Sequence, residues 1–282
     1  GYVLADNQLA LNAGWDMDLL SVEVGDLVGE GFNLDLIGFD DKMLAKLLAD
    51  PDAKALSGGH TLIPALKHRL NKPSALVDLS GIAEMKGIRR EGNAIIIGAL
   101  TRHVEVANSA EVKAAIPALA YLASHIGDVQ VRNRGTTLGN VCWADPRANM
   151  LVALAASEAA VVVQDAVGAL PRRLLLQDFV TGFRRNALAG GIATAIEVPL
   201  EARHGVYLKF ARQRQDLALV NVCVVRSGTA ACAVIGGLHD TPVRLPDVDA
   251  ALGHPAAPSL PSLVDALSRA GLATPADLHG SA

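Results

Sequence analysis

Aromatic residues are scarce in this chain: two Trp, three Tyr and five Phe make up 4% of its 282 residues. This scarcity excludes an aromatic core, so the interior must consist mainly of Ala, Leu and Val side chains. A composition that is 51% hydrophobic and 19% charged is typical of a globular protein, not of a disordered one. A chain of this length can bury more than one core, and we expect two or three domain-sized units.

Cysteine is equally sparse. Cys142, Cys223 and Cys232 are odd in number and none stands in a CxxC spacing. This argues against a disulfide framework, and against a zinc or iron–sulfur site held within this chain. We interpret the three as buried small apolar side chains in a reducing compartment, which favours a cytoplasmic location. The eight His residues also show no metal-ligand spacing, so we expect neither a metal site nor a catalytic residue here.

Long apolar runs and a strong charge of one sign are missing as well. The longest apolar stretch, residues 150–163, is interrupted by Ser157 and Glu158 and is too short to span a bilayer. No secretory signal pattern is visible at the start of the sequence. The formal net charge is only −4, which indicates neither a nucleic-acid-binding surface nor a membrane-binding surface.

The pattern of apolar residues predicts several helices and strands. The acidic first 50 residues favour two short amphipathic helices, one after Asp16 and one after Asp40 or Asp41. After them the sequence predicts strands at 53–57, 75–79, 94–99 and 160–164, and helices at 62–70, 104–125 and 149–156. Residues 127–146 are interpreted as a loop-rich segment.

The last third of the chain alternates like an antiparallel sheet. Strands are expected at 194–200, 205–213, 217–227 and 229–237, with a hairpin turn at Ser227-Gly228. Helical patterns return beyond Leu245, and Pro258 and Pro261 mark a break between them.

Two loops rich in small residues are candidates for binding an anion. In residues 57–61, Gly58 and Gly59 lie between an expected strand and helix, where backbone amides can approach a phosphate closely. Residues 135–140 offer Gly135 and Gly139 beside hydroxyl and amide groups that suit phosphate or ribityl oxygens. Each loop alone could equally be a tight structural turn. A shared ligand requires the two loops to meet in space.

Several segments in a fixed order carry a family resemblance. They are SGGHTLIPALKHRL, PSALVDLS, IIIGALTRHVEV, GDVQVRNRGTTLGN, WADP and YLKFAR. From about residue 53 onward the chain resembles the FAD-binding medium subunit of aerobic carbon monoxide dehydrogenases and of related molybdenum hydroxylases such as xanthine dehydrogenase. Residues 1–50 instead resemble a fragment of a ParB-like module.

The resemblance implies an α+β protein with the PCMH-type FAD-binding fold. Two α/β subdomains would occupy residues 51–203. A shortened C-terminal domain of the carbon monoxide dehydrogenase flavoprotein type, made of an antiparallel sheet and helices, would occupy residues 204–282.

The implied function is that of an oxidoreductase subunit. Electrons would pass from iron–sulfur clusters on a small subunit through FAD to an external acceptor, while a large subunit holds the molybdenum cofactor. No membrane span and no nucleic-acid partner are expected. Two alternatives are a stand-alone flavin oxidase and a truncated or fused product without function, which carries a DNA-partition-type fragment at its N-terminus.

The resemblance also implies which residues bind FAD. The first loop would grip the diphosphate with Lys54, Ala55, Leu56, Ser57, Gly58, Gly59, His60, Thr61 and Leu62, with His60 acting through its backbone. The second loop would do so with Thr136, Thr137, Leu138, Gly139 and Asn140. Further contacts would come from Asp145, Asn149 and Lys209.

Three of these positions need comment. Leu138 stands where the family nearly always has glycine; if the position required a positive φ, leucine would cost about 1–2 kcal/mol and Leu138→Gly would tighten FAD binding. Asn149 stands where the family has a carboxylate. Lys209 would place a positive charge near the flavin N1–C2 edge, or it is simply an edge-strand lysine with its ammonium in solvent.

Overall fold

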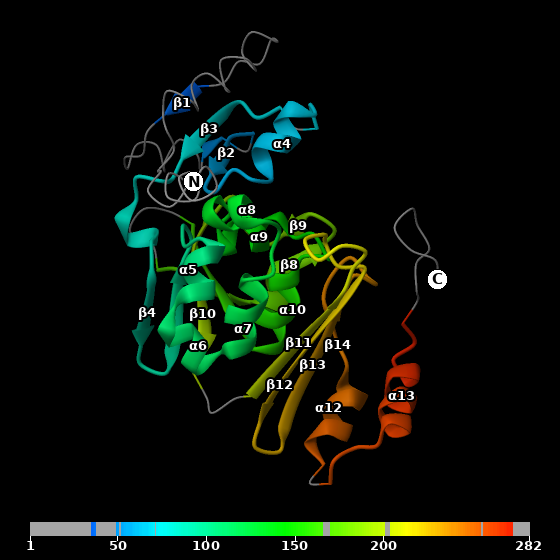
Figure 1. The fold of residues 1–282 in the computed structure, drawn as a ribbon. Helices are drawn as coiled ribbons and strands as arrows, with labels where there is room; N and C mark the ends of the chain where they lie inside the picture. The colour runs from blue at the N-terminus through cyan, green and yellow to red at the C-terminus, as the bar shows by residue number, and fades with distance from the viewer. Residues whose placement is uncertain are drawn as a thin grey trace, which may run out of the picture.

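The computed structural model describes residues 35–37, 49–50, 52–70, 72–165, 170–200, 204–254 and 256–272. The helices expected after Asp16 and Asp40 lie outside these residues, and so does nearly all of the ParB-like segment. Where the chain is described, it forms a small parallel sheet, a larger antiparallel sheet with helices, and a second antiparallel sheet (Figure 1). The expected α+β class is confirmed.

The small parallel sheet carries the first glycine loop. Its strand order is β1-β3-β2, formed by β1 (Asp35–Ile37), β3 (Ala75–Asp78) and β2 (Lys54–Leu56). Residues 57–61 connect β2 to the short helix α4 (Leu62–Lys67). All four β3 residues are buried, as is usual for a central strand of a parallel sheet.

The larger antiparallel sheet forms the middle of the molecule, in the order β4-β5-β10-β6-β7. Its strands are β4 (Ile88–Glu91), β5 (Ala94–Gly98), β10 (Ile192–Pro199), β6 (Ala160–Gln164) and β7 (Arg172–Leu175). The 3-10 turn η1 (Ala83–Met85) precedes β4, and α11 (Leu176–Phe179) leads into a small ladder of β8 (Val180–Gly182) and β9 (Arg185–Asn186). The strand at 160–164 is confirmed, whereas the strand expected at 194–200 belongs to this sheet and not to the C-terminal one.

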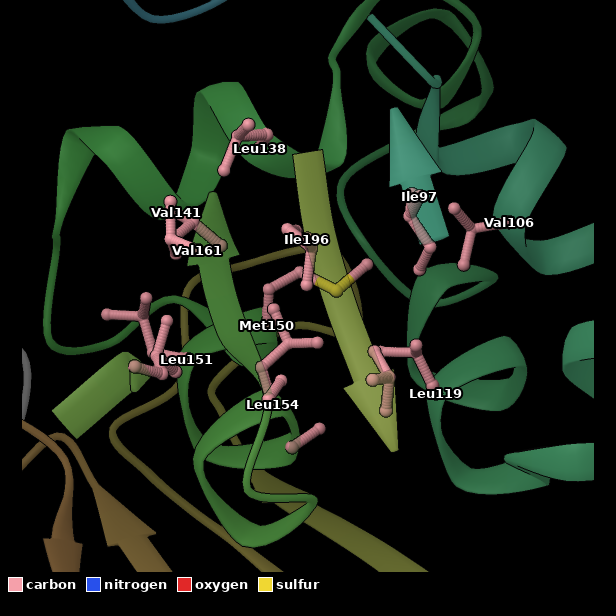
Figure 2. Packing of buried hydrophobic residues seen from close by; sticks show 14 of the residues in the cluster. Ile97, Val106, Leu119, Leu138, Val141, Met150, Leu151, Leu154, Val161 and Ile196 are labelled. Atoms are coloured by element: carbon pink, nitrogen blue, oxygen red, sulfur yellow. The ribbon is translucent and has the colours of Figure 1, made fainter. Parts of the chain in front are cut away.

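Helices pack against this sheet and enclose the main core. They are α5 (His103–Asn108), α6 (Ala110–Ala115), α7 (Pro117–Ala123), α8 (Val129–Arg134), α9 (Thr137–Trp143) and α10 (Asn149–Ala156). Figure 2 shows Met150, Leu151 and Leu154 of α10 among aliphatic side chains from the strands and neighbouring helices. The core is aliphatic, as the scarcity of aromatic residues required.

The single helix expected at 104–125 is wrong, because the segment is divided into α5, α6 and α7. Ser109 caps α6 by accepting a hydrogen bond from the Val112 amide at 3.2 Å. Pro117 begins α7, since proline lacks the N–H group that a helix interior requires. The loop expected at 127–146 is also wrong: Asp128 and Thr136 cap α8 and α9 within it.

The C-terminal sheet has the order β11-β12-β13-β14. It consists of β11 (His204–Phe210), β12 (Val220–Ser227), β13 (Ala230–Gly236) and β14 (Val243–Arg244), followed by α12 (Pro246–Gly253) and α13 (Leu260–Arg269). The hairpin is confirmed, with Ser227 paired to Ala230 and Gly228 at φ +57°. None of the helices in the described part is long and apolar enough to cross a membrane.

Candidate functional site

The two glycine loops touch each other. The Ser57 and Thr136 hydroxyl groups, 79 residues apart in sequence, form a hydrogen bond of 2.8 Å between their oxygens. A Cβ atom on Gly58 would lie 2.4 Å from the Arg134 carbonyl oxygen and 2.9 Å from the Thr136 backbone nitrogen. The first loop therefore rests directly on the backbone of the second, and only glycine at position 58 permits this approach.

Local capping explains the shape of the second loop. Thr136 is the N-cap of α9, and its hydroxyl oxygen accepts a hydrogen bond from the Gly139 amide at 3.2 Å. The Gly135 carbonyl accepts from the His103 amide and the Thr137 amide donates to the Thr101 carbonyl, both at 3.0 Å. These bonds fix the loop to the segment that precedes α5.

The His103 side chain packs against the second loop. Its side chain is 2% exposed, its Nδ1 lies 3.5 Å from the Thr137 hydroxyl oxygen, and a Cβ on Gly135 would meet its ring at 3.1 Å. Burial, helped by the positive charges of Arg132 and His60, lowers the pKa of His103 to about 3. The imidazole is therefore neutral at physiological pH and acts as a packing group.

The joined loops form one wall of a cavity of about 770 Å³. This volume lies within the range of roughly 300–1,000 Å³ that small-molecule and cofactor sites occupy. The candidate residues that line the cavity are Lys54, Ala55, Ser57, Gly58, Gly59, His60, Thr61, Leu62, Thr136, Leu138, Gly139 and Asn140. The rest of the lining includes the end of α9 and residues 188–193, which run into the start of β10.

The polar lining fits a ligand that carries hydroxyl groups and negative charge. Asn140 lines the cavity, and its Oδ1 atom is buried without a hydrogen-bond partner among the described residues. A ribityl or ribose hydroxyl of FAD could donate to this acceptor, which would otherwise carry an uncompensated desolvation cost. Lys54 and Arg184 also line the cavity, and Asp50 is the one acidic residue doing so within the described part of the chain.

The main-chain amides of the second loop contribute less than the sequence suggested. In the second loop the amides of Thr137, Gly139 and Asn140 already donate to protein oxygens. Helices α4 and α9 have only six and seven residues, so the electrostatic effect of their N-termini is small. Burial, and after it the Arg134 guanidinium, lower the pKa of His60, so this lining residue offers an uncharged ring near neutral pH.

Five candidate residues do not line the cavity: Leu56, Thr137, Asp145, Asn149 and Lys209. Leu56 and Thr137 are fully buried, and the Asp145 carboxylate accepts from the Arg147 amide at 3.0 Å. The Lys209 ammonium donates to the backbone carbonyls of Arg214 and Asp216 at 2.7 and 3.0 Å. Cofactor contacts by these five residues stay predictions that the cavity geometry does not support.

Leu138 is not strained. It lies within α9 and is absent from the described non-glycine residues with positive φ. Its side chain is 2% exposed and belongs to the main core, where Figure 2 shows it beside Val141. The expectation that Leu138→Gly would tighten binding loses its physical basis, because glycine there would remove buried apolar surface from the core.

Trp143 and Arg184 also line the cavity, although sequence reasoning did not select them. The Arg184 guanidinium carbon lies 4.8 Å from the centroid of the Trp143 ring, within cation–π distance. No local motif marks Arg184, since its relation to Trp143 depends on a contact between distant parts of the chain. Cys142 also lines the cavity, and burial raises the pKa of its thiol to about 12, so the thiol is protonated near neutral pH.

Comparison with known proteins identifies the family. Residues 41–201 match the family model described as the FAD binding domain in molybdopterin dehydrogenase. The chain is 34% identical over 210 residues to the glyceraldehyde dehydrogenase medium chain of Sulfolobus acidocaldarius, covering 72% of this chain and 74% of that one. It is 33% identical over 230 residues to the carbon monoxide dehydrogenase medium chain of Afipia carboxidovorans, covering 77% and 79%.

Solved structures show the same fold. A chain of the carbon monoxide dehydrogenase from Hydrogenophaga pseudoflava that lacks the Mo-pyranopterin moiety of its cofactor superposes with a TM-score of 0.81 at 31% identity. The superposition covers 89% of this chain and 90% of that one. The family resemblance seen in the sequence is therefore confirmed.

Proposed function

This chain belongs to the family of FAD-binding domains of molybdopterin dehydrogenases, and we propose that it is the FAD-binding medium subunit of a molybdenum-dependent dehydrogenase complex. Its task is to take electrons from iron–sulfur clusters on a small subunit and to pass them to an external acceptor. Substrate oxidation takes place at the molybdenum cofactor of a large subunit. The observation that supports the proposal is that both glycine loops meet and line the same cavity.

The residues of the cavity would hold FAD in a defined way. Gly58 allows the loops to adjoin, and the Ser57 and Thr136 hydroxyls lie at the junction where a diphosphate would bind. The Asn140 side chain offers an acceptor to a ribityl hydroxyl. When bound, FAD supplies the ability to take up and release electrons, which no side chain here provides.

The assembly with other subunits rests on the relatives and on the cysteines. The similar proteins are named medium chains or medium subunits, which are parts of larger assemblies. The three cysteines form no disulfide, and Cys223 and Cys232 are buried in the C-terminal sheet. Iron–sulfur clusters would therefore have to come from a partner, and a cytoplasmic location remains part of the proposal.

The domain division is proposed with the same boundaries. Strand β10 ends at Pro199 within the middle sheet, and β11 begins the separate C-terminal sheet at His204. This supports a boundary between residues 203 and 204, with the FAD-binding part before it.

The proposal is tested in two steps. The purified chain should bind FAD with quenching of flavin fluorescence, and ADP should compete because it carries the same diphosphate. Rapid mixing of the FAD-loaded chain with the reduced iron–sulfur subunit should then bleach the flavin absorbance. Failure to bind FAD, alone or with the partner subunits, would overturn the proposal.

A stand-alone flavin oxidase gives a different result in the same experiment. In that case chemically reduced flavin would be reoxidised rapidly by dissolved oxygen, and the iron–sulfur subunit would not reduce it. The electron-transfer subunit should instead react faster with a quinone or NAD⁺ than with oxygen.

A further inference from the structure

Arg184 lines the cavity and lies close to two aromatic rings. Its guanidinium carbon is 4.8 Å from the centroid of the Trp143 ring and 4.9 Å from that of Phe183. Both Trp143 and Arg184 line the cavity, while Phe183 is 46% exposed. The planar cation therefore lies within cation–π distance of both rings.

The backbone around Arg184 is fixed by contacts with the end of α9. The Arg184 amide donates to the Ala144 carbonyl at 3.0 Å, and the Asn186 side chain donates to the Cys142 carbonyl at 2.7 Å. Arg184 and Ala144 both have φ of +53°, in the left-handed region, and Ala144 is the C-cap of α9. The position of Arg184 is therefore fixed relative to the end of α9.

Within the described ranges no carboxylate neutralises the charge of Arg184. Among the described residues its guanidinium group forms no ion pair with a carboxylate. Lys209, the cation that the sequence suggested for the flavin, donates instead to two backbone carbonyls away from the cavity. Arg184 is thus the better placed positive charge for a ligand in this cavity.

The distance between the loops and Arg184 indicates which part of FAD could lie beside Arg184. Helix α9 runs from its N-cap Thr136, at the junction of the loops, to Trp143. At 1.5 Å per residue these seven residues span about 10 Å. A diphosphate at the junction would leave a ring of the dinucleotide beside Trp143 and Arg184.

The chemistry of the ring favours the flavin over adenine. Arginine offers only hydrogen-bond donors, and the pyrimidine edge of the flavin presents carbonyl oxygens and N1 as acceptors. The adenine edge alternates a donor with acceptors and carries no charge. Uptake of two electrons and one proton leaves the flavin with one additional negative charge on the N1–C2 edge, which a fixed cation stabilises.

We propose that Arg184, stacked on Trp143, binds the pyrimidine edge of the flavin and stabilises its reduced, anionic form. The inference rests on the proposed function, since it requires FAD in this cavity. The electrons come from the iron–sulfur partner in the complex, or from dithionite in the test below.

The test compares Arg184→Met with Arg185→Met in the full chain. Both remove one positive charge, but Arg185 does not line the cavity. We expect Arg184→Met to lower the preference for reduced over oxidised FAD about tenfold, which is a midpoint potential about 30 mV lower for a two-electron couple. Arg184→Lys should recover part of the change, while Arg185→Met should leave the potential as in the wild type.

Binding measurements separate the possible failures. Affinity for FMN should fall in Arg184→Met and affinity for ADP should not, because ADP lacks the flavin. An unchanged potential, or an equal loss of ADP affinity, would overturn the inference and leave FAD binding intact. If the wild-type chain itself binds no FAD, the proposed function fails instead.

Discussion

Replacing Gly58 with alanine should separate the two loops that line the cavity. The added Cβ would lie 2.4 Å from the Arg134 carbonyl oxygen, whereas ordinary contacts begin at 3.4 Å. All of its nearest neighbours are backbone atoms, so no side-chain rotation can relieve the clash. The loops must therefore move apart by about 1 Å.

A movement of this size has a calculable effect. It would stretch the Ser57–Thr136 hydrogen bond from 2.8 Å beyond the usual limit for hydroxyl groups. The lost bond should lower the free energy of unfolding by about 0.5–1.5 kcal/mol and the overpacking by about 1–3 kcal/mol. The melting temperature of the variant should therefore be several degrees lower. FAD affinity should fall at least tenfold, or about 1.4 kcal/mol, because the two walls no longer hold one diphosphate together.

Two glycine variants serve as controls. Gly253→Ala in α12 creates a similar clash, with a Cβ 2.5 Å from the Thr229 carbonyl oxygen, but lies away from the cavity. It should lower the melting temperature without changing FAD affinity. Gly81→Ala meets nothing within 4 Å and should change neither quantity. Fluorescence titration and thermal unfolding would be measured on all three variants.

The reasoning is refuted if Gly58→Ala binds FAD as tightly as the wild type. It is also refuted if Gly253→Ala loses affinity to the same extent, because the loss would then reflect general destabilisation and not the junction of the loops.

Three further predictions follow from the same site. Leu138→Gly should destabilise the protein by about 3–5 kcal/mol in urea unfolding and should not tighten FAD binding; tighter binding would restore the strained-leucine hypothesis. Asn140→Leu should weaken FAD binding about tenfold but leave the apoprotein as stable, because the buried Oδ1 has no partner to lose; a destabilised apoprotein would contradict this. The pKa of His103 is about 3 when folded and 6.5 when unfolded, so protonation favours the unfolded chain. Stability should be complete above that unfolded pKa and fall by about 1.4 kcal/mol per pH unit between it and the folded pKa, and His103→Gln should show a smaller slope.

Local sequence signals identified most regular elements. Helix α10 begins and ends at the expected residues, because an alanine-rich apolar run favours a helix. Strands β3, β5 and β6 were found because each is a short apolar run bounded by turn residues. The short helices α8 and α9 were missed, although Asp128 and Thr136 stood at their N-caps as available signals.

The site could be predicted only in part, because its geometry depends on long-range contacts. The glycines marked both loops, but the contact between residue 58 and residues 134–136 is a property of the fold. Residues 188–193 carry no motif and yet line the cavity. In the sequence Arg184 has no feature that distinguishes it from a surface arginine, because its contact with the Trp143 ring arises only in the folded chain.

The structure also explains how this chain can carry leucine at position 138. A glycine is required there only if the loop holds its ligand by close backbone approach. Here the Gly139 and Asn140 amides are engaged within the protein and the Ser57 and Thr136 hydroxyls bond each other, whereas the buried Asn140 Oδ1 has no partner among the described residues and is available to a ligand. If the Asn140 side chain contacts the ligand, the backbone of this turn need not approach it closely. The neighbouring Leu138 side chain can then pack into the core. The Leu138 side chain is 2% exposed and adds buried apolar surface to the core. It still lines the cavity, which stays open beside it.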